Sequence, residues 1–215
     1  MRLVVAGAGG HARSVLEALR TSTGTLQATA CTDADATLHG SAIGGVPIVG
    51  DDGVLASLRE QGVLAACLGL GGVGDNRPRA ALHARLATLD FDLPSIAHGS
   101  AYVSATATLG DASVVLARAV VCAGAYLNDD VIVGSGAVVE HDCRIGAHAH
   151  LASGCVLGGA VSVGAGAHVG LGATILQGRS VGAWATVGAG AVVTRDVPAG
   201  ETVVGCPASS RERRA

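Results

Sequence analysis

Three consecutive ionisable residues, Glu140, His141 and Asp142, are the strongest candidates for chemistry in this sequence of 215 residues. A histidine titrates near neutral pH and can remove a proton from an attacking nucleophile. A carboxylate beside it can fix the imidazole tautomer and stabilise the imidazolium. Both carboxylates are candidates for that contact. We predict a general base at His141, and a solvated turn without chemistry is the alternative.

A six-residue repeat surrounds this triplet. Every sixth residue from Val103 to Val193 is Val, Ile or Leu, and the residue four positions later is small or aliphatic except at Arg179. One such unit makes a short strand and a corner, so three units of six residues close a triangular coil of eighteen. The pattern predicts a parallel β-helix over residues 95–215, with the triplet at one corner.

Residues 1–94 are predicted to form a small Rossmann-like α/β domain. A strand at 3–6 leads into the glycine turn G-A-G-G-H-A and then into a helical pattern at 14–19. Such a turn presents backbone N–H groups to phosphate, although it can also be purely structural. We therefore predict that Gly9, Gly10 and His11 bind the phosphates of a ligand.

Two further segments of this domain end in polar residues. A strand at 26–31 is followed by Asp33 and Asp35, which are candidates for hydrogen bonds with a ribose or a base. An apolar run at 63–70 leads to G-D-N-R, where Asn76 is a further candidate for binding the substrate, and then to a helix ending near residue 89. The domain is too short for a two-lobed dinucleotide fold, so we expect a mononucleotide group.

Composition argues against several classes of protein. The net charge of −3 does not suggest nucleic-acid binding. No signal-peptide pattern follows Met1, and the six cysteines form no CxxC pair, so we expect a cytoplasmic protein. Residues 145–178 carry no Asp, Glu, Lys or Arg, which is long enough to span a bilayer. The six-residue period explains that stretch as β-helix interior, and we expect no membrane contact.

The glycine turn, the segment 44–50, the G-D-N-R motif and the repeats together resemble one branch of the hexapeptide-repeat acyltransferases. These are bacterial enzymes that N-acetylate nucleotide-linked 4-amino-4,6-dideoxysugars, with related sialic-acid O-acetyltransferases. The resemblance covers residues 95–207 of the repeat and implies a left-handed β-helix, acetyl-CoA as co-substrate and a homotrimer with active sites between subunits. Within this branch the chain resembles the GDP-perosamine N-acetyltransferases, which implies GDP-perosamine as acceptor and a place in O-antigen (lipopolysaccharide) synthesis.

The resemblance also implies roles for single residues. The family's general base and its acidic neighbour fall on His141 and Asp142, and its histidine beside the acetyl group falls on His150. The backbone N–H of Gly159 would face the thioester oxygen. The residues implied to hold CoA further along are Gly178, Gly205 and Pro207.

Three other positions are less determined. His168, one coil beyond His150, is expected either to support it or only to stack on it. His148 is expected to be solvated. Many relatives carry an Asn near the sugar, seven residues before the general base, but here that residue is Gly134, so this sugar contact cannot be assigned.

The expected reaction is direct attack of the 4-amino group on the acetyl carbonyl, with no acyl-enzyme, because Cys143 and Cys155 fall in core positions of the repeat. The same reaction on a UDP-linked amino sugar, O-acetylation of a sialic acid, and a non-enzymatic trimeric scaffold are alternatives. A zinc site like that of γ-type carbonic anhydrases needs a different histidine spacing, so no metal is predicted.

Overall fold

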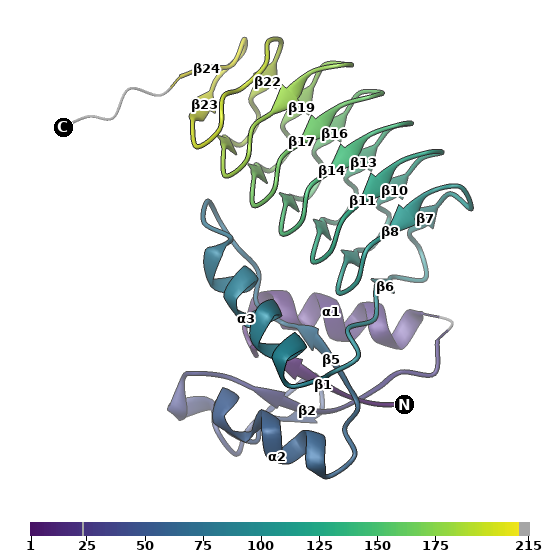
Figure 1. The fold of residues 1–215 in the computed structure, drawn as a ribbon, viewed down its shortest axis with the longest axis vertical. Helices are drawn as coiled ribbons and strands as arrows, with labels where there is room; N and C mark the ends of the chain where they lie inside the picture. Colours follow the sequence, from purple (N-terminus) through teal and green to yellow (C-terminus); the bar gives the residue numbers. More distant parts are fainter. Residues whose placement is uncertain (23, 211–215) are drawn as a thin grey trace, which may run out of the picture.

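The computed structural model describes residues 1–22 and 24–210, which form an N-terminal α/β domain followed by a β-helix (Figure 1). The tail predicted at 211–215 lies outside the described residues. The division between residues 94 and 95 remains a prediction, and the first strand of the β-helix begins at Ile96.

The N-terminal domain is a parallel sheet of three strands in the order β2-β1-β5, with helices on both faces. Side chains of β1 alternate between the two faces: Leu3 and Val5 pack with α1, and Val4 and Ala6 pack with residues of α2 and α3. The elements are β1 (Arg2–Ala6), α1 (Gly10–Thr21), β2 (Gln27–Thr32), the hairpin β3 (Ala42–Ile43) and β4 (Val46–Pro47), α2 (Leu55–Glu60), β5 (Ala65–Leu68) and α3 (Arg77–Thr88), with short 3₁₀ turns at Ala36–Leu38 and Asp52–Val54.

The β-helix has three faces, each a sheet of stacked short strands, which have two residues each except for β23 with three. The first face holds β7 (Tyr102–Val103), β10 (Val120–Val121), β13 (Val138–Val139), β16 (Val156–Leu157), β19 (Thr174–Ile175) and β22 (Val192–Val193). The second holds β8 (Thr108–Leu109), β11 (Tyr126–Leu127), β14 (Arg144–Ile145), β17 (Ser162–Val163) and β20 (Ser180–Val181). The third holds β6 (Ile96–Ala97), β9 (Val114–Val115), β12 (Ile132–Val133), β15 (His150–Leu151), β18 (His168–Val169), β21 (Thr186–Val187) and β23 (Thr202–Val204), with β24 (Ser209–Ser210) antiparallel at its end.

The register confirms the predicted β-helix of hexapeptide repeats. Strands pair in parallel with partners one coil apart, as Val120 pairs with Val138. The aliphatic positions form one continuous core along the axis, although Val103 and Leu109 in the first coil are only partly buried. The first coil has a neighbour on one side only, so its aliphatic side chains are less completely covered.

The two parts of the chain pack against each other. The layer under α1 continues into the β-helix through Ile96, Val114 and Leu116, and the layer under α3 includes Ala112. Helix α3 lies alongside the coils (Figure 1). No helix among the described residues is long and apolar enough to cross a membrane.

Candidate active site

His141 lies at the corner between the first and second faces, in the turn that joins β13 to β14. Its Nδ1 is 2.9 Å from Oδ2 of Asp142, and the two side chains are 63% and 66% exposed. With Nδ1 bonded to the carboxylate, Nε2 is the ring nitrogen that remains to act as a base. Glu140 instead lies against the thiol of Cys122, whose pKa is raised by burial and by this carboxylate.

The next two coils place Gly159 and Gly178 at the same corner. The N–H of Ala160 donates to the carbonyl of His141 at 2.8 Å, and the N–H of Gly178 donates to the carbonyl of Gly159 at 2.9 Å. A Cβ on Gly159 would collide with Nε2 of His141. Within the part of the chain that the structure describes, the N–H of Gly159 has no acceptor. The structure therefore brings an imidazole and a free backbone donor together.

Gly205 and Pro207 lie in the turn between β23 and β24, further along the β-helix. The carbonyl of Gly205 accepts a hydrogen bond from the N–H of Val192 at 3.0 Å. Val192 stands on the same face as Val138 and three coils beyond it. At about 4.8 Å per coil the distance along the axis is roughly 14 Å, so these two residues could contact the same ligand as His141 only if that ligand is elongated.

A cavity of about 450 Å³ lies where the glycine turn meets the β-helix. Its wall includes predicted ligand-binding residues from both parts of the chain, namely Gly9, Gly10, His11, Asp33 and His150. The first turn of α1 has no side-chain cap, so its N–H groups are open to an anion.

The structure gives further information on two of these residues, His11 and Asp33. Burial and the charge of Arg79 lower the pKa of His11 to about 4, so its imidazole is neutral at pH 7. Asp33 Oδ2 accepts the N–H of Ala8 at 2.7 Å, so this carboxylate also fixes the glycine turn.

His150 lies on β15 of the third face and joins the two parts of the chain. Its Nδ1 donates to the carbonyl of Gly72, which leaves Nε2 as an acceptor. Burial, with a smaller effect of His168, lowers the pKa of His150 to about 3. The His168 ring meets it edge-on at 4.9 Å between centroids. A second cavity of about 400 Å³ shares His150 and Val73 with the first and continues along the third face.

Three expectations differ from the structure. Asp35 lies outside the cavity, because its carboxylate accepts the N–H and hydroxyl of Thr37, and these bonds lower its pKa. Asn76 is fully buried and bonds to carbonyls of the β-helix instead of facing a ligand. His148 was expected to be solvated, which is wrong: its Nδ1 is 2.8 Å from Oδ2 of the buried Asp130.

Within one chain His141 and His150 are not brought together. His141 occupies the corner between the first and second faces, and His150 lies on the third face. In a triangular coil the third face is opposite that corner. A site that contains both histidines therefore needs a second copy of the chain.

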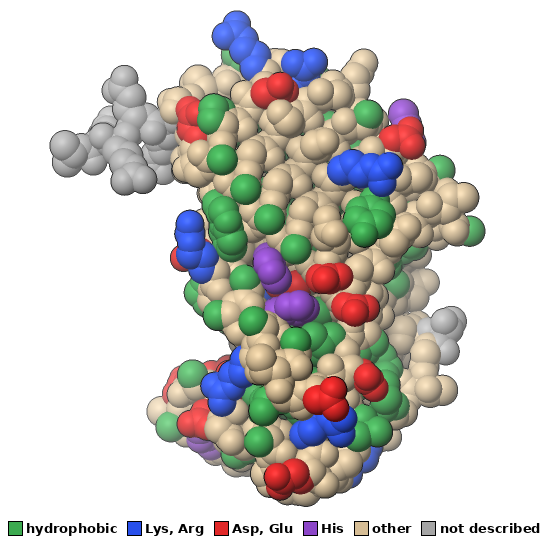
Figure 2. Space-filling model, viewed as in Figure 1, with side chains coloured by type: hydrophobic (Ala, Val, Ile, Leu, Met, Phe, Trp, Pro, Cys, Tyr) green, Lys and Arg blue, Asp and Glu red, His purple; other side chains and the backbone are tan. Residues whose placement is uncertain are grey.

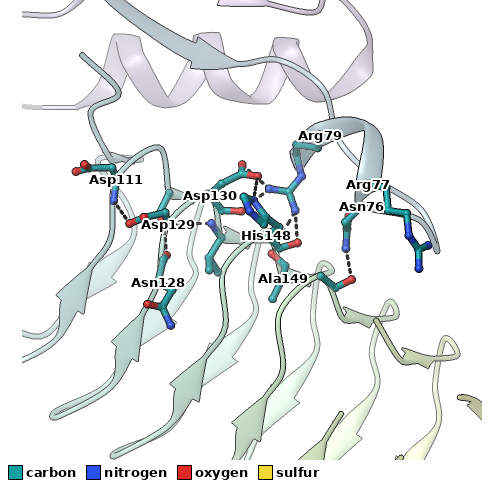
Figure 3. A network of polar contacts seen from close by, with 12 residues as sticks. Asn76, Arg77, Arg79, Asp111, Asn128, Asp129, Asp130, His148 and Ala149 are labelled. Carbon is teal, nitrogen blue, oxygen red and sulfur yellow. Dashed lines mark hydrogen bonds and ion pairs between the residues drawn. The ribbon is translucent and has the colours of Figure 1, made fainter. Parts of the chain in front are cut away.

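Sequence reasoning missed a buried ion pair between Arg79 of α3 and Asp130 of the β-helix, drawn in Figure 3. On the face shown in Figure 2, histidine and acidic side chains gather where the N-terminal domain meets the β-helix. The sequence contained a sign that Arg79 is buried. It lies on one face of the helix with Leu82 and Leu86, at a position where an apolar residue is expected.

The chain matches two known protein families. Residues 2–86 match the PglD N-terminal domain family, and residues 129–159 match the bacterial transferase hexapeptide family. A comparison with curated proteins returned no match. Among the described residues, no three His, Cys, Asp or Glu side chains are grouped to hold a metal ion.

Two solved structures are similar over nearly their whole length. A histidine-to-alanine mutant of GDP-perosamine N-acetyltransferase from Caulobacter crescentus, solved with CoA and GDP-perosamine, is 40% identical, covers 99% of this chain and 98% of its own, and has a TM-score of 0.92. The acetyltransferase domain of PglB from Neisseria gonorrhoeae is 36% identical, with 98% and 99% covered and a TM-score of 0.87.

A β-helix of hexapeptide repeats with a His–Asp pair at an exposed corner defines an acyltransferase of the hexapeptide-repeat class. The chain belongs to the sugar N-acetyltransferase family within this class, the branch that includes GDP-perosamine N-acetyltransferase.

Proposed function

We propose that this enzyme transfers the acetyl group of acetyl-CoA to the 4-amino group of a nucleotide-linked 4-amino-4,6-dideoxysugar, with GDP-perosamine as the first candidate. The observation that carries the proposal is the placement of His141, paired with Asp142, directly over the backbone of Gly159. The full-length likeness to an enzyme solved with CoA and GDP-perosamine supports the choice of substrates.

The geometry of the corner supports a role for each of three residues. Asp142 holds Nδ1–H of His141, so Nε2 removes the proton of the amine as it attacks the acetyl carbonyl. The N–H of Gly159 stabilises the negative charge that develops on the carbonyl oxygen. The thiolate of CoA leaves directly. Glu140 faces Cys122 and is given no contact with the ring, which narrows the predicted catalytic set to two side chains.

Binding roles divide between the two parts of the chain. Gly9, Gly10 and His11 would hold the pyrophosphate at the N-terminus of α1, with the nucleoside near Asp33 in the first cavity. The residues proposed to hold CoA follow one line along the β-helix from the corner of His141: Gly159, Gly178, Gly205 and Pro207.

A homotrimer is proposed because the site is incomplete in one chain. The corner of His141 in one subunit would meet the third face of the next, where His150 lines both cavities. This arrangement would put His150 beside the acetyl group and the sugar within reach of His141. We place the enzyme in the cytoplasm, where nucleotide sugars for O-antigen synthesis are made.

The test is CoA release from acetyl-CoA with GDP-perosamine, a UDP-4-amino-4,6-dideoxysugar and free sialic acid. We expect turnover with GDP-perosamine, and a fall in kcat of about 10²- to 10⁴-fold in His141→Asn. His98→Asn, which changes a histidine in another turn, serves as the control. Turnover with the UDP sugar alone would keep the chemistry and change the nucleotide. Turnover with sialic acid alone, or an active His141→Asn enzyme, would overturn the proposal.

A further inference from the structure

Helix α3 contacts consecutive coils of the β-helix through polar side chains at its first turn (Figure 3). Asn76, which precedes the helix, donates from Nδ2 to the carbonyl of Gly166 at 3.1 Å. Arg79 donates to the carbonyl of His148 at 2.6 Å and to that of Asp130. Residues 130, 148 and 166 are eighteen apart, so they occupy one corner in three consecutive coils. We call these three carbonyl groups the carbonyl ladder.

The spacing of the ladder matches the rise of α3. Stacked coils are about 4.8 Å apart. An α-helix rises about 1.5 Å per residue, so the three residues from Asn76 to Arg79 advance by about 4.5 Å. Asn76 and Arg79 are therefore about one coil apart, as are the carbonyl groups of Gly166 and His148 that they bind. The carbonyl groups alone would allow α3 to dock one coil higher or lower, because every coil offers the same backbone.

The side chains at this corner differ from coil to coil and remove that ambiguity. The corner residues in order are Ala112, Asp130, His148, Gly166 and Trp184. Among these five residues only Asp130 offers a carboxylate to Arg79, and Gly166 carries no side chain where the ring of Trp184 lies. One coil further, the guanidinium of Arg77 lies 4.7 Å from the ring centroid of Trp184. Asp130, Gly166 and Trp184 thus distinguish one docking position of α3 from the positions one coil higher or lower.

The Arg79–Asp130 pair is buried, with side chains 1% and 2% exposed and 2.5 Å between Nη1 and Oδ1. Oδ2 of Asp130 accepts from Nδ1 of His148, so both carboxylate oxygens are used. A buried ion pair gives little net stability, since desolvation offsets the attraction. A docking position that left Arg79 charged and unpaired would be strongly disfavoured. The main effect of the pair is therefore to select one position.

The position at which α3 docks on the β-helix sets the geometry of the proposed ligand site. The loop from Gly69 to Gly74 connects β5 to α3, lines both cavities, and accepts the hydrogen bond of His150 at Gly72. Arg79 also holds the carbonyl of His148, two residues before His150. We infer that Arg79 and Asp130 fix the register in which the nucleotide-binding domain docks on the β-helix, so that the sugar-nucleotide cavity faces His150. Arg79 is in this sense a positioning residue, and the inference rests on the proposed function.

The decisive variant is Arg79→Met/Asp130→Asn, which removes both charges and leaves no buried ion unpaired. Misplacement of the ligand by about 1 Å costs on the order of 10²-fold in kcat/KM, and we expect such a loss for the sugar nucleotide. KM for acetyl-CoA should stay within about twofold, because the CoA residues belong to the β-helix alone. Arg85→Met is the matched control, since Arg85 is exposed on α3 and bonds only within the N-terminal domain.

A readout without catalysis separates this inference from the proposed function. The ¹⁵N signals of the His150 imidazole report whether Nδ1–H still donates to Gly72. We expect them to change in the double variant and in Arg79→Lys, which keeps the charge but lacks the planar fork, and to stay unchanged in Arg85→Met. If no acceptor is turned over by the wild type, the proposed function fails and this readout still decides the inference. Unchanged His150 signals, or equal losses for both substrates, would overturn the register role.

Discussion

Gly159 lies directly beneath the imidazole of His141, so close that a Cβ at position 159 would occupy the place of Nε2. Gly159→Ala should therefore push the ring aside and lower kcat by about 10²-fold. The ring is largely exposed and can turn into water, so the free energy of unfolding should change by less than about 1 kcal/mol. Steady-state kinetics and denaturant unfolding of the same preparation measure both effects.

The double variant Gly159→Ala/His141→Asn shows whether the loss comes through the ring. If Gly159 acts by leaving space for His141, the alanine should add almost nothing once the imidazole is gone. Independent losses that multiply in the double variant would instead point to a separate role for the glycine backbone.

The two carboxylates beside His141 should behave differently. Asp142→Asn removes the charge that holds Nδ1–H and supports the imidazolium, and we expect kcat to fall about 10- to 100-fold. Glu140→Gln changes a group that faces Cys122, so its effect on kcat should be below about threefold. A larger loss in Glu140→Gln than in Asp142→Asn would contradict the assignment.

Two buried histidines make stability depend on pH. The pKa values of His11 and His150 fall from 6.5 to about 4 and about 3 on folding. Between pH 6.5 and 4 the unfolded chain therefore binds more protons than the folded one. The free energy of unfolding is at its full value above pH 6.5 and should fall on acidification, by up to about 1.4 kcal/mol per pH unit for each histidine.

Denaturant unfolding at pH 7, 6 and 5 measures this slope. His11→Gln and His150→Gln should each reduce this slope, by up to about 1.4 kcal/mol per pH unit. Stability that stays constant from pH 7 to 5 would mean that neither imidazole is kept neutral by folding.

The buried Arg79–Asp130 pair predicts that the double variant Arg79→Met/Asp130→Asn is more stable than the single variant Asp130→Asn. Asp130→Asn leaves the Arg79 charge buried without a counter-ion and should lower the free energy of unfolding by about 3–5 kcal/mol. Adding Arg79→Met removes that charge and should recover most of the loss. Urea unfolding of the wild type and both variants provides the comparison. A double variant less stable than Asp130→Asn would show that the pair acts mainly through packing.

The β-helix was predictable because every six-residue unit of the repeat has the same pattern of buried side chains. An aliphatic side chain every sixth residue and a small one four positions later leave few alternatives to a three-sided coil. The three strands of the parallel sheet in the N-terminal domain were also predicted to within about two residues, because parallel strands buried on both faces are continuous apolar runs. The handedness came from the resemblance, since a period carries no sign.

The site was predictable only where the repeat itself marked an anomaly. His141 and Asp142 stand out because they load one corner with ionisable groups. Asn76 and His148 were misassigned because their partners are far away in sequence: Asn76 bonds to Gly166, 90 residues on, and His148 pairs with an aspartate one coil earlier. Long-range polar contacts leave no periodic trace in a single sequence.

The carbonyl ladder also has a consequence for synthesis of the chain. Arg79 and Asn76 are made 51 and 90 residues before the carbonyl groups that they bind. At roughly 5–20 residues per second, the later partner emerges roughly 5–20 s afterwards. During this interval the docking edge of α3 is exposed to water, where a guanidinium and an amide are well solvated and an apolar stripe would attract other nascent chains. With this polar anchor, the docking edge of α3 carries no such apolar stripe while its support is still being translated.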